Sequence, residues 1–317
     1  MCLCINKIFS FQKFCNFDAK QVLSIMKIKK YAAIDIGSNA VRLLVSNIIE
    51  NDKKVKFKKV SLVRVPIRLG ADVFVTGKIS ERNKRRLIDA MTGFKYLMKA
   101  HEIERYMAAA TSAMREAENG KKIVEEIKKK TGINIQIIDG AKEAELIAST
   151  DLEDLLDRDR TYLYVDVGGG STEFSIFHNG KKNASKSFKL GTVRLLKNMV
   201  DKSEWDKAEQ WVKTHTKKYD KVYLIGSGGN INKLFKMSGK VPGAPLSKVY
   251  LDAQYKFLKS MPYKDRIKEL DMNPDRADVI IPAAKIYRRA MQWSGAEKIY
   301  VPKIGLADGI VKYLYQK

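Results

Sequence analysis

Cysteine and histidine are scarce in this 317-residue sequence, and their positions exclude several kinds of chemistry. All three cysteines lie within the first fifteen residues, so the body of the chain has neither a disulfide nor a thiol nucleophile, as expected for a cytoplasmic protein. A zinc site is not expected, because the histidines stand alone at His101, His178 and His215. No apolar stretch is long enough to span a membrane, and we expect no membrane association.

Acidic residues are also few relative to basic ones. The chain has 36 Asp and Glu against 60 Lys and Arg, which gives a net charge of +24. Such a field favours polyanions, which include nucleic acid, polyphosphate and highly phosphorylated nucleotides. The alternative is that the lysines only solvate the surface. Charge alone therefore predicts an anionic partner without identifying it.

The central motif of the chain is Asp-Val-Gly-Gly-Gly-Ser-Thr-Glu at residues 166–173. An apolar run precedes it and an alternating run follows, a pattern that predicts a strand, a tight glycine turn and a second strand. Consecutive glycines let backbone N–H groups converge on one point, which suits a phosphate. Asp166 and Glu173 flank the turn, and carboxylates beside a phosphate site suggest a bridging divalent cation. The alternative is a glycine-rich hairpin with no function.

The same pattern occurs earlier in the chain, which strengthens the functional interpretation. Residues 33–45 align without gaps on residues 164–176, and Asp35 takes the place of Asp166. Arg42 occupies the place of Glu173, so a cation in one copy corresponds to a carboxylate in the other. A repeat at this spacing indicates two related lobes rather than a solenoid. Two facing lobes form a cleft, which is a favoured place for a ligand.

The order of the remaining segments predicts the domains. Residues 1–25 differ from the rest and are expected to be an unstructured or non-native extension, with Met26 as the natural start. Lobe I is assigned to residues 26–150 and lobe II to residues 151–317, with the last helix, 306–317, able to cross back to lobe I. In lobe I we expect strands at 31–37, 40–49, 54–65 and 105–110, a loop at 66–77 and a helix that Ser80 caps.

Three further sites are candidates for binding or catalysis. Arg115 lies in a predicted first helical turn, where it can clamp a phosphate; the alternative is an ion pair with Glu116 or Glu118. Glu143 begins another helix and is either a partner of the helix dipole or the carboxylate that orients water. Gly228 and Gly229 belong to a third glycine loop between a strand and a helix.

Taken together, the motifs resemble one known family. They are Asp-Ile-Gly-Ser-Asn at 35–39, Thr-Ser-Ala-Met-Arg at 111–115, Gly-x-x-Glu-Ala at 140–144, the central motif, Gly-Ser-Gly-Gly-Asn at 226–230 and Arg-Ala-Asp at 276–278. In this combination and order the chain resembles the exopolyphosphatase / guanosine pentaphosphate phosphatase family over about residues 28–317. The resemblance implies an α/β fold with two ribonuclease-H-like lobes, the actin-like ATPase fold, around a central cleft.

The resemblance also implies roles for single residues. Glu143 matches the family's catalytic glutamate, which orients or activates water. Asp166 and Glu173 match carboxylates that serve the metal, expected to be Mg²⁺ or Mn²⁺, and Asp35 lies beside the first loop as a third candidate ligand. The expected phosphate-binding residues are Gly37, Ser38, Asn39, Arg42, Arg115, Gly168, Gly169, Gly170, Ser171, Gly228 and Gly229.

The chain departs from the family pattern at two positions after Gly140. Lys142 replaces the first acid of Gly-x-Glu-Glu-Ala, and Glu145 stands where arginine is common, which leaves local charge and substrate preference open. Since the sequence ends after the second predicted lobe, we expect the short form of the family, without the C-terminal helical domains of longer members. The expected function is release of terminal orthophosphate from polyphosphate, or of the 5′-γ-phosphate from guanosine pentaphosphate. Nucleic acid is not an expected partner, and a homodimer is compatible with this interpretation. The alternatives are an actin-like kinase or ATPase and a polyanion-binding protein without catalysis.

Overall fold

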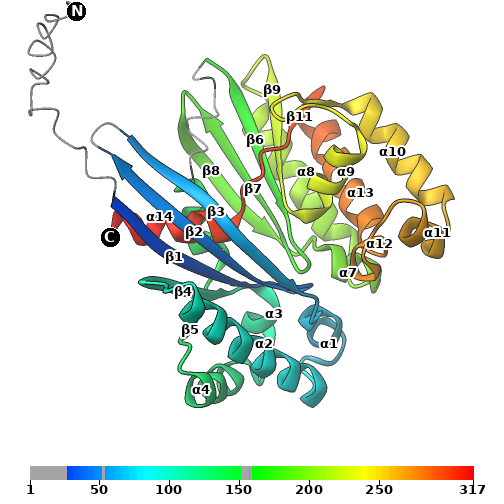
Figure 1. Cartoon of the computed structure of the whole chain (residues 1–317). Coiled ribbons are helices and arrows are strands. Elements are labelled where there is room, and N and C mark those ends of the chain that lie inside the picture. Colours follow the sequence, from blue (N-terminus) through cyan, green and yellow to red (C-terminus); the bar gives the residue numbers. More distant parts are fainter. Residues whose placement is uncertain (1–26, 52–53, 151–156, 158) are drawn as a thin grey trace, which may run out of the picture.

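The computed structural model describes residues 27–51, 54–150, 157 and 159–317, which form two α/β lobes (Figure 1). The proposed extension at residues 1–25 lies outside the described residues. The proposed boundary between the lobes, at residues 150–151, falls at the edge of a segment that also lies outside them. The sheet of the first lobe has the order β3-β2-β1-β4-β5. Strands β1 to β3 are antiparallel neighbours, and β4 and β5 run parallel to β1. The strands are β1 (Lys27–Ile36), β2 (Val41–Asn51), β3 (Lys54–Val65), β4 (Arg105–Ala110) and β5 (Ile135–Ile137).

The second sheet repeats this order with one strand added at its edge. Its order is β10-β11-β9-β6-β7-β8, in which β6, β7 and β8 form the antiparallel part and β9 and β11 run parallel to β6. The strands are β6 (Thr161–Val167), β7 (Thr172–His178), β8 (Lys181–Phe188), β9 (Val222–Ser227), β10 (Leu246–Ser247) and β11 (Lys298–Tyr300). The shared order confirms the predicted fold class of two ribonuclease-H-like lobes.

The helices of the first lobe follow the apolar spacing of the sequence, with one correction. Helix α2 is capped by Ser80, whose hydroxyl accepts from the Asn83 N–H at 3.3 Å. The segment 66–77, expected to be a loop, contains helix α1, because burial of Leu69, Val73 and Phe74 outweighs the turn-forming residues that flank it. The helices are α1 (Leu69–Thr76), α2 (Glu81–Ala100), α3 (Ser112–Glu116), α4 (Gly120–Thr131) and α5 (Gly140–Ala148).

Most helices of the second lobe surround α13, whose buried face lies in the larger apolar core. They are α7 (Thr192–Leu196), α8 (Lys202–Thr216), α9 (Gly229–Met237), α10 (Lys248–Ser260), α11 (Tyr263–Lys268), α12 (Pro274–Ala277) and α13 (Ile280–Ser294). No helix in the described ranges is both long and apolar enough to cross a membrane.

The last helix, α14 (Leu306–Gln316), joins the two lobes. It packs against β1, β2, β4 and α5 of the first lobe (Figure 1). A Cβ on Gly309 would lie 1.9 Å from the carbonyl oxygen of Leu146, so the backbones of α14 and α5 touch. Around this contact, apolar residues of both lobes form one shared cluster that includes Tyr31, Tyr164 and Ile310. This cluster fixes the lobes relative to each other beneath the cleft.

Candidate functional site

The two duplicated glycine loops meet in the cleft between the lobes. Each is closed by the same hydrogen bond, from Gly37 N–H to the Ala40 carbonyl at 3.1 Å and from Gly168 N–H to the Ser171 carbonyl at 2.9 Å. A Cβ on Gly169 would lie 2.9 Å from the Cβ of Ser38, so the loops are in van der Waals contact. The sequence repeat is therefore also a repeat of backbone geometry, with both turns at one point.

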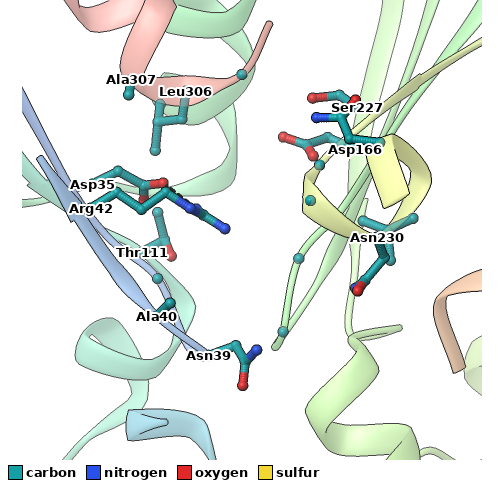
Figure 2. Close-up of a pocket in the computed structure, with 18 of the residues that line it drawn as sticks. Asp35, Asn39, Ala40, Arg42, Thr111, Asp166, Ser227, Asn230, Leu306 and Ala307 are labelled. Atoms are coloured by element: carbon teal, nitrogen blue, oxygen red, sulfur yellow. Dashed lines mark hydrogen bonds and ion pairs between the residues drawn. The ribbon is translucent and has the colours of Figure 1, made fainter. Parts of the chain in front are cut away.

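A cavity of about 460 Å³ lies above these loops, and both lobes line it. In Figure 2, Asp35 and Arg42 lie on one wall and Asp166 and Ser227 on the other. Among the residues expected from the sequence, the cavity brings together Asp35, Gly37, Ser38, Asn39, Arg42, Glu143, Asp166, Gly168, Gly169, Ser171, Gly228 and Gly229. Gly170, Glu173 and Arg115 are not part of its lining.

Strand register gives the two walls different charge. Asp35 lies directly opposite Arg42 on the neighbouring strand, and the two side chains form an ion pair at 2.6 Å. At the equivalent place in the second lobe, Asp166 lies opposite Glu173. Like charges at directly opposed positions repel each other. The second lobe therefore has two carboxylates at the position where the first lobe has an ion pair.

Glu143 lies between the lobes at the start of α5, which Asp139 caps by accepting from the Lys142 N–H at 2.7 Å. The helix starts close to the second lobe, because a Cβ on Gly140 would lie 2.9 Å from the Cβ of Ser187. The Glu143 side chain is buried, and its Oε2 has no hydrogen-bond partner. An unsatisfied buried carboxylate oxygen is costly, and such groups are concentrated at functional sites.

The environment of these carboxylates favours their protonated forms. Burial, and then the neighbouring carboxylates, raise the pKa of Glu143 well above its ordinary value of 4.5. The same causes raise the pKa of Asp166 from 3.8 to about 7. Burial also raises the pKa of Glu173, although hydroxyls of Ser171 and Ser187 donate to it at 2.7 and 2.8 Å. The site is therefore short of positive charge near Asp166 and Glu143.

Sequence reasoning missed a group of arginines on the cleft wall. Arg276 and Arg64 line the cavity with Arg42. Burial, and then the charges of Arg64 and Arg42, lower the pKa of Arg276, which forms no ion pair within the described chain. Arg64 is paired with Asp275, which also accepts from the Asn39 side chain across the cleft. The Arg-Ala-Asp motif at residues 276–278 could have indicated Arg276, but nothing in the sequence places this motif beside β3.

Arg194 holds the glycine loop from behind and was also missed. Its Nε donates to the Gly170 carbonyl at 2.7 Å, and its guanidinium lies 3.8 Å from the centre of the Phe74 ring. It also forms an ion pair with Glu116 of the first lobe. The side chain is buried, so this cation positions the loop rather than contacting the cavity. Arg194 and Gly170 are 24 positions apart, so the sequence gives no sign of this contact.

Arg115 lies apart from the main cavity. Its Nη1 donates to the Ile138 carbonyl at 2.6 Å, and it lines a second cavity instead. The ion pairs considered for it do not form in the described chain, because Glu116 pairs with Arg194 and Glu118 with Lys78. Its positive charge still lowers the pKa of Glu143 and of Glu173, which partly offsets their burial.

A divalent cation is compatible with part of this arrangement. Within the described residues, no three or more His, Cys, Asp or Glu side chains converge as a ready-made cage. Asp35 and Glu173 already have partners in Arg42 and the two serines. Asp166 has a raised pKa and lines the cavity, and Mg²⁺ commonly uses one or two carboxylates with water and substrate phosphate as its other ligands. Asp166 therefore fits a cation that the substrate helps to hold.

Gly228 shapes the third loop for close approach to Asp166. It has φ of 109°, a conformation that side chains disfavour, and a Cβ there would lie 3.4 Å from the Asp166 Oδ1. Helix α9 begins directly after it, and Gly229 and Asn230 line the cavity. Amides at this end of the helix add partial positive charge to the wall that carries Asp166.

Comparisons with known proteins agree on one family. A model of the Ppx/GppA phosphatase family matches residues 48–317. The chain is 29% identical over 297 residues to the bifunctional 3-dehydroquinate synthase/phosphatase of Fusobacterium nucleatum, covering 85% of this chain but only 44% of that relative. It is 26% identical over 320 residues to exopolyphosphatase 2 of Mycobacterium tuberculosis, covering 90% of this chain and 98% of the relative.

Solved structures show the same fold. The crystal structure of an exopolyphosphatase from Cytophaga hutchinsonii superposes with a TM-score of 0.79 at 23% identity, covering 91% of this chain and 98% of that one. The Aquifex aeolicus member of the Ppx/GppA family gives 0.71 at 24% identity, covering 92% and 98%.

Proposed function

This chain belongs to the Ppx/GppA phosphatase family, and we propose that it releases terminal orthophosphate from inorganic polyphosphate, the 5′-γ-phosphate from guanosine pentaphosphate, or both. The observation that supports this most is the contact between two equivalent glycine loops above buried carboxylates. Backbone amides from both loops can surround a terminal phosphoryl group, whose transition state spreads negative charge over its equatorial oxygens.

Glu143 is proposed to orient the attacking water. It is buried at the junction of the lobes, and its free Oε2 can accept a hydrogen bond from that water. Positioned bases of this kind contribute roughly 10²–10⁴-fold to rate. Attack forms a bond from the water oxygen to the terminal phosphorus and breaks the bond to the bridging oxygen, which keeps the electron pair, while the proton lost by the water passes to the ionised Glu143 carboxylate. Most of the acceleration must then come from electrostatic stabilisation by the loops and the arginines.

A divalent cation, Mg²⁺ or Mn²⁺, is proposed to be held by Asp166. When bound, it supplies the positive charge that lets carboxylates and a phosphate occupy one pocket. Arg276, whose guanidinium lies beside Gly229, and Lys303 line the cavity without ion pairs in the described chain, and they are suited to the phosphates that follow the terminal one. The overall charge of +24 raises the encounter rate with such anions.

The test is steady-state phosphate release from three substrates, with and without Mg²⁺. We expect release from polyphosphate, guanosine pentaphosphate or both, with ATP a poorer substrate. Turnover of ATP alone would instead support a kinase or ATPase. Salt-sensitive binding of polyphosphate without any turnover would identify a polyanion-binding protein.

A further inference from the structure

A second cavity, of about 580 Å³, adjoins the central glycine loop. Ser171 lines both this cavity and the main one. The other lining residues come from α3, β8, α8 and the segment that follows β8: Arg115, Glu116, Ser187, Phe188, Lys189, Glu204 and Lys207. None of these lines the main cavity, so the two cavities are distinct and meet at Ser171. That hydroxyl donates to Glu173, which lies beside the shared wall.

The charged groups of the second cavity favour an anion. Glu116 is already neutralised by Arg194. Glu204 accepts from the backbone N–H of Lys189 at 2.7 Å and lies 3.7 Å from the Lys207 ammonium, a distance at which the pair is weak. The ammonium of Lys189 and the guanidinium of Arg115 form no ion pair in the described chain. Two cations therefore face this space without a direct ion pair, although Arg115 also lies within electrostatic reach of the buried Glu143 and Glu173.

The geometry points to an orthophosphate site on the product side of the reaction, and this inference rests on the proposed hydrolase function. After cleavage, orthophosphate is formed at the loop that ends in Ser171, while the shortened polymer still fills the main cavity. We infer that orthophosphate leaves past Ser171 into the second cavity, where Arg115, Lys189 and Lys207 receive it. The shortened chain can then remain bound and advance by one phosphate, because product and polymer do not share an exit.

If orthophosphate has its own site, it should bind to protein whose main cavity is already filled with polyphosphate. In Glu143→Gln protein saturated with polyphosphate, radiolabelled orthophosphate should still bind in equilibrium dialysis. Adding Lys189→Glu and Lys207→Glu should weaken that binding about tenfold or more, because charge-assisted hydrogen bonds are replaced by repulsion. Lys213→Glu is the matched control. Lys213 also lies on α8 and pairs with a glutamate one turn away, Glu209, as Lys207 does with Glu204, but it does not line the second cavity.

Kinetics provide the second readout. In the wild-type enzyme, orthophosphate should inhibit polyphosphate hydrolysis with a noncompetitive component. In the Lys189→Glu/Lys207→Glu enzyme this component should disappear, and the KM for polyphosphate should change less than about twofold. Purely competitive inhibition that is equal in all variants would overturn the inference while leaving the hydrolase intact. If polyphosphate is neither bound nor hydrolysed, the proposed function fails, and orthophosphate binding that depends on Lys189 and Lys207 would still identify the anion site.

Discussion

Replacement of Asp166 by asparagine should make the protein more stable at neutral pH, and the gain should depend on pH. Asp166 lies opposite Glu173 in strand register and near other carboxylates, and its pKa is raised from 3.8 to about 7. A carboxyl group with a raised pKa in the folded state favours folding below its unfolded pKa. That contribution is lost as the pH rises towards 7. Asparagine keeps the shape of the side chain and avoids the loss.

The expected size follows from the same pKa. The stability gained by Asp166→Asn should be close to zero near pH 3, about 0.5 kcal/mol at pH 4, about 1.5 kcal/mol at pH 5 and at most about 4 kcal/mol above pH 7, where it levels off. Asp166 is partly accessible from the cavity, which makes the largest figure an upper limit. Glu143 adds to the stability gained by the substitution. The charge of Asp166 raises the pKa of Glu143, so removing that charge also makes ionised Glu143 less unfavourable in the folded protein.

Urea denaturation at pH 5, 6, 7 and 8, without divalent cations, measures this effect. Asp206→Asn, at an exposed position on α8, controls for the loss of a carboxylate elsewhere. A stability difference that stays constant with pH, or that shrinks as pH rises, would refute the electrostatic account of the site. Mg²⁺ should narrow the difference at pH 8 by stabilising the wild type, since a ligand that binds only the folded state adds to its stability.

Three further variants test other parts of the account. Glu143→Gln should keep polyphosphate binding and lower turnover by roughly 10²–10⁴-fold; turnover close to wild type would remove Glu143 from the mechanism. Gly309→Ala should destabilise the protein by about 1–3 kcal/mol, because its Cβ would lie 1.9 Å from a backbone oxygen of α5. Gly93→Ala, inside α2 with nothing within 4 Å of the added Cβ, is its control and should stabilise by up to about 1 kcal/mol; equal effects in urea denaturation would contradict the packing described for α14. Arg194→Met should reduce kcat more than it raises KM, since it releases the Gly170 carbonyl; a change in KM alone would show that Arg194 contacts substrate instead.

Much of the fold and the meeting of the two loops could be predicted from the duplicated motif. A strand, a tight turn and a strand that occur twice with an aspartate at the same place define equivalent turns in equivalent sheets. The structure gives both turns the same closing hydrogen bond and brings them into contact. The roles assigned to these loops, to Glu143 and to the carboxylates stay predictions.

The remaining features depend on contacts between distant segments, which spacing cannot show. Helix α1 forms inside a segment with turn-forming residues because its apolar side chains find a place in the core. Arg276 reaches the cleft only because α12 lies near β3, where Arg64 pairs with Asp275. Arg115 faces a second cavity because its guanidinium donates to the carbonyl of Ile138, a residue more than twenty positions away.

The most direct test of the central claim is the crystal structure of Glu143→Gln with a short polyphosphate and Mg²⁺. We predict that the terminal phosphoryl group lies between the two loops and accepts hydrogen bonds from backbone amides of residues 38–39 and 169–171, since the amides of Gly37 and Gly168 close the loops. A polyphosphate bound only to surface lysines, with both loops empty at saturating ligand, would contradict it.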